Sequence, residues 1–193
     1  MVSVKSTMLP LGTPVPELEL PDAAGVRHGT ADSAGAPGLL VAFVCNHCPY
    51  VIHVAKDLGR LAEDWMARGL AVLAINSNDT EAYPADAPDL MPGFAETNGW
   101  TFPYLVDESQ DVALAYRAAC TPDFFLFDGD RRLAYRGRLD GSRPNSGVPV
   151  TGDDLAAAVD AVLTGRPAPT TQLPSMGCNL KWKPGKAPDY FPA

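Results

Sequence analysis

One short stretch of the sequence constrains the fold more than any other. Residues 39–44 form an unbroken apolar run, Leu-Leu-Val-Ala-Phe-Val, which predicts a buried strand. The run ends at the segment Cys-Asn-His-Cys (45–48), and Pro49 then opens a long helical pattern, where proline is well tolerated in the first turn. The sequence therefore places two cysteines at a strand-to-helix turn, beside unpaired backbone N–H groups and the positive end of a helix dipole.

The position of this cysteine pair indicates thiol chemistry. The N-terminus of a helix favours thiolate over thiol, and the thiolate is the nucleophile in disulfide exchange. We expect Cys45 to be the attacking thiol, because it is N-terminal in the pair and closest to solvent. Cys48 is then the resolving thiol that closes the disulfide and releases the substrate. A structural thiol pair and a metal-binding pair are the other interpretations of this spacing.

His47 lies between the two cysteines and has two interpretations. An imidazolium at this position would stabilise the thiolate and make the pair more oxidising. Alternatively, His47 is an exposed loop residue without an electrostatic role. We favour the first interpretation, because perturbed ionisable groups are typical of functional sites.

The rest of the chain alternates strands with helices. Further strands are predicted at 70–75, 103–106, 123–127 and 133–139, and a short hairpin at 17–20 and 26–28. Helices are predicted at 49–68, 90–98, 107–119 and 155–163. This order predicts an α/β fold with a central mixed β-sheet and helices on both faces. We expect the polar loop 76–89 to border the cysteine pair.

The chain divides into one domain and a tail. With 193 residues, of which 46% are hydrophobic, it can bury a full core without disulfide staples. Residues 1–164 carry all of the predicted elements and form one domain. Residues 165–193 are rich in proline and form an extended C-terminal tail, which is not an independent domain.

Charge and the N-terminal sequence exclude several classes of function. The chain has 15 basic and 23 acidic residues, a net charge of −8, and no basic stripe, which argues against nucleic acid and anionic membranes as partners. Residues 1–10 lack the apolar region of a signal peptide, so we expect a cytoplasmic protein. In a reducing compartment a cysteine pair is more often catalytic or metal-binding than structural.

Three features of the chain resemble the thioredoxin superfamily. They are the cysteine pair between strand and helix, the dipeptide Thr121-Pro122 just before a strand, and the closing hairpin and helix. The resemblance covers about residues 14–164 and implies a thioredoxin-like fold. It also implies a cis Thr121–Pro122 bond, with Pro122 facing the cysteine pair and offering backbone groups to a bound peptide.

Within this superfamily the chain is most similar to peroxiredoxin-like proteins of the AhpC/TSA type that carry a thioredoxin-type cysteine pair. The segments 118–128 (AACTPDFFLFD) and 174–183 (PSMGCNLKWK) are typical of that subgroup. Its members are mostly described as thiol oxidoreductases, so the resemblance implies the chemistry without naming a substrate.

The chain also departs from its superfamily. In an alignment on Cys48, Val41 and Cys45 stand where peroxiredoxins have the proline and threonine that bind peroxide, and Pro122 stands where they have an arginine. Thioredoxins usually have a buried acid at the position of Leu39. Proton transfer to Cys48 must therefore use water or another group.

These observations favour a thiol–disulfide oxidoreductase. Its substrate would be a disulfide in a protein or a small molecule, and an unidentified thiol would donate electrons. No organic cofactor or bound metal is expected, because the electrons reside in Cys45 and Cys48. Three alternatives stay open: a thiol peroxidase with antioxidant activity, a copper metallochaperone with Cys45, Cys48 and His47 as ligands, and a redox-inert binding module.

Two further cysteines lie outside the pair. Cys120 precedes Pro122 closely, so the fold should hold it near the pair, either as a third redox thiol or as a buried free cysteine. A further hypothesis is that Cys178, in the tail, folds back to meet Cys120 as a resolving or structural partner.

Overall fold

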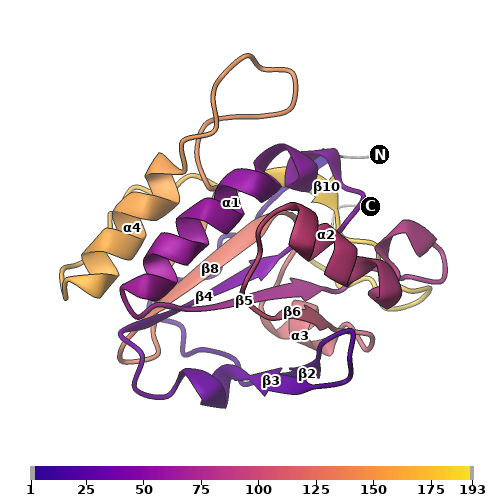
Figure 1. The fold of residues 1–193 in the computed structure, drawn as a ribbon, viewed down its shortest axis with the longest axis horizontal. Helices are drawn as coiled ribbons and strands as arrows, with labels where there is room; N and C mark the ends of the chain where they lie inside the picture. Colours follow the sequence, from indigo (N-terminus) through magenta and orange to yellow (C-terminus); the bar gives the residue numbers. More distant parts are fainter. Residues whose placement is uncertain (1–2, 192–193) are drawn as a thin grey trace.

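The centre of the structure is a five-stranded mixed sheet, shown in Figure 1. The computed structural model describes residues 3–191. The strands of the sheet are β4 (Gly38–Phe43), β5 (Ala71–Asn76), β6 (Tyr104–Val106), β8 (Asp123–Asp128) and β9 (Leu133–Gly137). Their order is β6-β5-β4-β8-β9; β4, β5 and β6 run parallel, and β8 runs antiparallel to both of its neighbours, β4 and β9. The strand that leads to the cysteine pair is therefore the central one.

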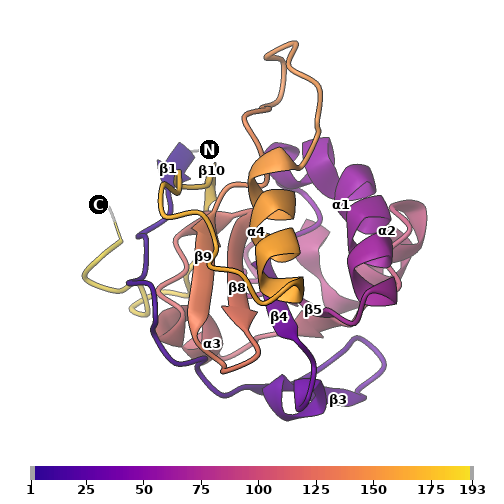
Figure 2. The same ribbon diagram turned by 90° about the vertical axis from the view of Figure 1, so that its left-hand side faces the viewer.

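Strand β4 is buried on both faces, which explains its unbroken apolar sequence. Leu40 and Ala42 pack into a cluster with α1 (Pro49–Ala67) and α4 (Asp153–Leu163). The alternate residues of β4 pack against α3 (Asp111–Ala115) on the opposite face. In Figure 2, α1 and α4 lie side by side on one face of the sheet. Helices on both faces are what the sequence predicted.

Shorter elements complete the chain. The predicted N-terminal hairpin is present as β2 (Glu19–Pro21) and β3 (Arg27–Gly29), which pair antiparallel. The remaining helical segments are η1 (Thr30–Ser33), η2 (Pro84–Asp86), η3 (Pro88–Leu90) and α2 (Met91–Thr97). Among residues 3–191, no helix combines the length and the apolar character that crossing a bilayer requires.

The predicted helix over 107–119 is wrong in its extent. Only α3, a helix of 5 residues, forms in that region. Gln110 just before it and Arg117 just after it both adopt a left-handed backbone conformation, with φ of 65° and 51°. Asp107 does not enter the helix; its Oδ2 atom accepts a hydrogen bond from the backbone N–H of Ala113 at 2.9 Å. The acidic residue thus caps the helix start rather than extending it.

The C-terminal tail contains a strand that the sequence did not predict. β10 (Met176–Asn179) pairs antiparallel with both β1 (Ser3–Lys5) and β7 (Cys120–Thr121), in the order β1-β10-β7. A Cβ atom at Gly177 would collide with the carbonyl oxygen of Thr121, so only glycine permits this close approach. The tail therefore reaches the segment before Pro122. The division of the chain at residue 164 stays a prediction.

We expect Gly177→Ala to destabilise the protein, because the added methyl group forces β10 away from β7. Overpacking of this kind typically lowers the free energy of unfolding by about 1–3 kcal/mol, which urea denaturation measures. Gly93→Ala is the matched control: its Cβ meets no atom within 4 Å, and alanine in helix α2 should leave stability unchanged or raise it. Equal unfolding free energies for the two variants would contradict the tight β10–β7 contact.

Candidate active site

The structure brings the two predicted cysteines together with Thr121 and Pro122. Cys45 follows β4, and Cys48 is the N-cap residue of α1. The Cys48 thiol donates a hydrogen bond to the carbonyl oxygen of Thr121 at 3.1 Å, and Cys45 Sγ lies 3.5 Å from Thr121 Oγ1. The Thr121–Pro122 peptide bond is cis. The cysteine pair and the Thr121-Pro122 dipeptide, which are far apart in the sequence, therefore form one site after the end of β4.

Both sulfur-bearing side chains are buried. The exposed fraction of Cys45 is 1% and that of Cys48 is 0%. The expectation that Cys45 is close to solvent is therefore wrong for this conformation. The loop 76–89, which the sequence predicted to border the pair, and strand β10, which it did not predict, both contribute residues beside the pair.

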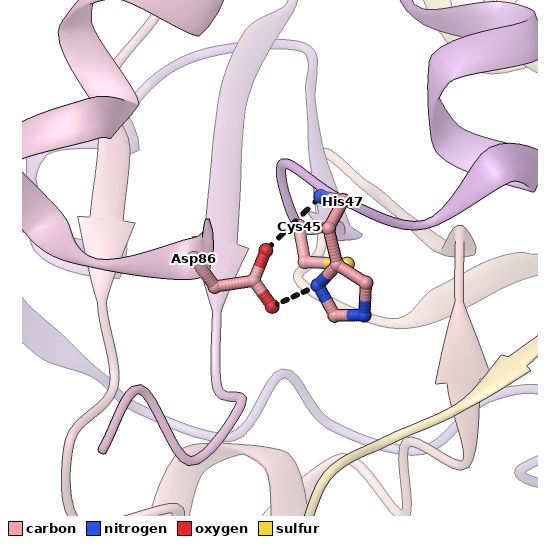
Figure 3. A group of neighbouring side chains, drawn as sticks. All are labelled: Cys45, His47 and Asp86. Atoms are coloured by element: carbon pink, nitrogen blue, oxygen red, sulfur yellow. Dashed lines mark hydrogen bonds and ion pairs between the residues drawn. The ribbon is translucent and has the colours of Figure 1, made fainter. Parts of the chain in front are cut away.

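A buried carboxylate, Asp86, holds the cysteine turn (residues 45–48). Its Oδ1 atom accepts hydrogen bonds from the backbone N–H groups of Asn46 at 2.8 Å and His47 at 3.1 Å. Its Oδ2 atom accepts from Asn78 Nδ2 at 2.8 Å and lies 2.6 Å from His47 Nδ1, as Figure 3 shows for the histidine. Asp86 has an exposed fraction of 0%, so this charge needs all of these partners.

Asp86 is a site residue that the sequence interpretation missed. The prediction that the loop 76–89 borders the cysteine pair is confirmed, because Asp86 lies in it. The acid itself carried no distinguishing signal, since its neighbours Pro84 and Ala85 are those of an ordinary turn. Its burial depends on the tertiary contact with the cysteine turn.

His47 has defined partners on two sides. Its Nδ1 atom pairs with Asp86, and its ring stacks on the ring of Tyr83, with a centroid distance of 5.7 Å and an interplanar angle of 7°. The interpretation of His47 as a loop residue without an electrostatic role is therefore wrong. A protonated His47 forms an ion pair with Asp86. The negative charge of the carboxylate therefore offsets part of the effect of the imidazolium charge on the sulfur atoms.

The hydrogen bonds among the thiols favour a thiolate at Cys48. Donation from the Cys178 thiol, and next from the Cys45 thiol, lowers the pKa of Cys48. The same bond to Cys48, then burial and the nearby charge of Asp86, raise the pKa of Cys45. In the structure the Cys48 thiol has the Thr121 carbonyl as its acceptor. The sequence placed the thiolate at Cys45; the lowered pKa of Cys48 and the raised pKa of Cys45 favour Cys48 instead.

The two further cysteines lie on opposite faces of the small sheet. Cys178 is paired with Thr121, and Asn179 is paired with Cys120. Because side chains alternate along a strand, Cys178 shares the face of Thr121, and Cys120 points to the other face. Cys120 donates to the Pro122 carbonyl at 3.6 Å, and burial raises its pKa. The hypothesis that Cys178 meets Cys120 is therefore wrong: its thiol partner is Cys48.

A second buried acid, Asp123, follows Pro122 directly. Its Oδ1 atom accepts a hydrogen bond from Ser6 Oγ at 2.7 Å, and its Oδ2 atom has no hydrogen-bond partner within residues 3–191. Burial raises the pKa of Asp123 to about 7. The sequence interpretation missed this residue, because it reads as the ordinary first residue of a strand.

A cleft opens beside Pro122. Tyr50 and His53 from α1, Arg138 after β9, and Met176 at the start of β10 contribute to its lining. Pro122 is the site residue that lines this cleft, and the two cysteines of the pair do not line it.

One group of side chains has the composition of a metal site. Ligand atoms of Cys45, His47 and Asp86 all lie within 4.8 Å of one another, as Figure 3 shows. Cys48, which the sequence named as a copper ligand, is not in this group. Two of the three ligand atoms, His47 Nδ1 and Asp86 Oδ2, are hydrogen-bonded to each other at 2.6 Å, so a metal would have to replace that bond.

Comparisons with known sequences agree on the family. A model of the AhpC/TSA family matches residues 11–136. The thiol-disulfide oxidoreductase ResA of Geobacillus kaustophilus is 26% identical over 124 residues, which are 64% of this chain and 67% of that protein. A putative peroxiredoxin of Mycobacterium tuberculosis is 29% identical over 114 residues, 59% of this chain and 68% of that protein.

Solved structures agree on the fold. The crystal structure of an uncharacterized conserved protein from Geobacillus kaustophilus has a TM-score of 0.93 and 51% identity, covering 96% of this chain and 98% of that chain. The thioredoxin domain of a thiol-disulfide oxidoreductase from Bacteroides vulgatus has a TM-score of 0.57 and 18% identity, covering 69% of this chain and 91% of that chain. The predicted thioredoxin-like α/β fold is confirmed.

We expect Asp86→Asn to lower the pKa of the Cys45 thiol, because the variant removes a negative charge that raises it. The pH dependence of iodoacetamide alkylation, followed by mass spectrometry of the peptide that contains Cys45, measures the change. Asp89→Asn, at an exposed position in the same loop region, is the control and should match the wild type. An unshifted alkylation profile in Asp86→Asn would contradict the electrostatic contact.

We expect Asp123 to make the protein less stable as the pH rises. Its pKa of about 7 in the folded protein exceeds its ordinary value of 3.8, so the folded state binds the proton more tightly than the unfolded state. The free energy of unfolding therefore decreases as the pH rises from 3.8 to about 7. Asp123→Asn stays neutral and should lose less stability over this window in urea denaturation. The assignment to Asp123 would be refuted if the unfolding free energy of Asp123→Asn depended on pH as steeply as that of the wild type. It would also be refuted if Asp89→Asn weakened this pH dependence as much as Asp123→Asn does.

Proposed function

This chain belongs to the AhpC/TSA family, and we propose that it is a thiol–disulfide oxidoreductase whose redox pair is Cys45 and Cys48. The observation that supports the proposal most directly is that both thiols contact Thr121, Cys45 at Oγ1 and Cys48 at the carbonyl oxygen, beside the cis Thr121–Pro122 bond. The relationship to ResA supports the same class of reaction. Disulfides of proteins or of small molecules are the proposed substrates.

In the proposed reaction, Cys45 attacks one sulfur of the substrate disulfide. Before the attack, the proton of Cys45 passes to the Cys48 thiolate, so that Cys45 is the thiolate nucleophile. A bond then forms between Cys45 and the attacked sulfur, the S–S bond of the substrate breaks, and the other substrate sulfur leaves as a thiolate. Cys48 then attacks the Cys45 sulfur, and its proton goes to the departing substrate thiolate. The substrate gains two electrons, and the protein is left with a Cys45–Cys48 disulfide.

This route gives the proton a path although the usual acid of thioredoxins is absent at Leu39. The Cys48 thiolate takes the proton from Cys45, so no carboxylate needs to lie beneath the pair. Because both cysteines are buried, a substrate must first displace the covering residues. The cleft beside Pro122 offers the approach.

A thiol peroxidase is the second candidate function. A thiolate at Cys48 is the species that attacks a peroxide, and a putative peroxiredoxin is among the relatives. Against it, Val41 and Cys45 occupy the positions that should bind peroxide. Hydrogen peroxide consumption that depends on Cys48, at a rate well above that of a free thiol, would favour the peroxidase and an antioxidant role.

Metal binding is the candidate of another class, since Cys45, His47 and Asp86 offer three ligand atoms. Copper(I) that stays bound through dialysis at one ion per chain, and is lost in His47→Ala, would favour it.

The oxidoreductase proposal also includes a cytoplasmic location and a thiol electron donor, because a reducing compartment regenerates the thiol pair.

We expect Cys45→Ser and Cys48→Ser each to reduce insulin disulfide reduction by dithiothreitol to the uncatalysed rate. Each variant removes one of the two sulfurs that must bond in turn. Cys120→Ser, at a buried position on the opposite face, is the matched control and should retain activity. The reduction potential of the wild-type pair, measured by equilibration with glutathione, should lie between about −270 and −120 mV, the range of thiol–disulfide oxidoreductases. Full activity in Cys45→Ser would refute this function.

A further inference from the structure

Cys48 lies between two thiols rather than one. Cys45, Cys48 and Cys178 belong to the same buried cluster, and Cys178 pairs with Thr121, whose carbonyl oxygen accepts from Cys48. The nearby thiols of Cys178 and Cys45 also lower the pKa of Cys48. We call these three residues the thiol cluster. Cys178 is buried, with an exposed fraction of 3%. A cysteine pair needs only one resolving thiol, so the third member requires an explanation.

The position of Cys178 is fixed by the backbone of β10. The strand pairs with β7 so that Cys178 is directly opposite Thr121, whose carbonyl oxygen contacts Cys48. Gly177 permits the close approach, because a Cβ at that position would collide with Thr121. On the other side, β1 pairs with β10 and holds it in place. Cys178 shares the face of Thr121, whose Oγ1 atom lies 3.5 Å from Cys45 Sγ, so its side chain lies on the side of the cysteine pair.

From this arrangement we propose that Cys178 is a second resolving thiol, which exchanges with the Cys45–Cys48 disulfide to form a Cys48–Cys178 disulfide. The inference rests on the proposed function, which supplies the oxidised pair. Cys120 does not take part, because it points to the other face of the small sheet.

The exchange step needs no external oxidant. The Cys178 sulfur attacks the Cys48 sulfur, the Cys48–Cys178 bond forms, and the Cys45–Cys48 bond breaks. The proton of Cys178 passes to the departing Cys45 sulfur, so one disulfide and one thiol are present before and after the step. No electrons enter or leave the protein.

The step changes what the oxidised protein can do. Cys45 becomes a thiol again while Cys48 is held in the disulfide with Cys178. A mixed disulfide between Cys45 and a substrate then persists, because Cys48 cannot resolve it until Cys178 is released. Such a form suits rearrangement of disulfides, whereas the simple pair suits reduction. The equilibrium between the two disulfides would therefore set the balance of these reactions.

The test is to map disulfides after oxidation with diamide. Full-length wild type, Cys45→Ser, Cys178→Ala and the double variant are oxidised, their remaining thiols are alkylated, and peptides are identified by mass spectrometry. We expect most of the Cys45→Ser protein to carry an intramolecular Cys48–Cys178 disulfide, and the double variant to carry none. Cys120→Ser is the matched control and should show the same linkages as wild type.

The two possible failures are distinguishable. If Cys45→Ser keeps its native circular dichroism and Cys48 stays unlinked or bonds only to another chain, the role of Cys178 is refuted. If Cys45→Ser does not fold, the disulfide map of the oxidised wild type provides the test. Absence of any Cys48–Cys178 linked peptide in the wild type would then refute the role of Cys178. If Cys178→Ala cannot form the Cys45–Cys48 disulfide and has no reductase activity, the proposed function itself fails.

Discussion

The site depends on one buried charge and the hydrogen bonds that satisfy it. The carboxylate of Asp86 accepts from the backbone of Asn46 and His47, and His47 Nδ1 lies at its second oxygen. A carboxylate with an exposed fraction of 0% is stable only with such partners. The same bonds fix the cysteine turn, and thereby the separation of Cys45 and Cys48. The loop after β5 and the turn after β4 therefore hold each other in place.

Around this turn, three strands bring functional groups together. Cys45 follows the end of β4, β7 contributes the Thr121 carbonyl that contacts Cys48, and β10 contributes Cys178. The neighbouring thiols lower the pKa of Cys48 and raise that of Cys45. In the proposed reaction the thiolate at rest and the attacking sulfur therefore belong to different residues, and a proton moves between them.

The large elements could be predicted from the sequence because their signals are local. The apolar run of β4 and the helical spacing of α1 each depend on neighbours in the chain. The helix over 107–119 was overestimated because the left-handed conformation of Gln110 is not visible in a hydrophobic pattern. Strand β10 was missed because it is short and its segment is rich in proline, and only its pairing with β1 and β7 makes it a strand.

The sequence by itself determined the candidate residues: a cysteine pair at a strand-to-helix turn, and a Thr-Pro dipeptide before a later strand. Each of these signals spans only a few residues, so the local sequence suffices to recognise it. Only the tertiary structure decided the partners of that pair. Asp86, Asp123 and Cys178 acquire their roles through burial and contact with residues distant in the chain, and a pattern read along the sequence carries no record of such contacts.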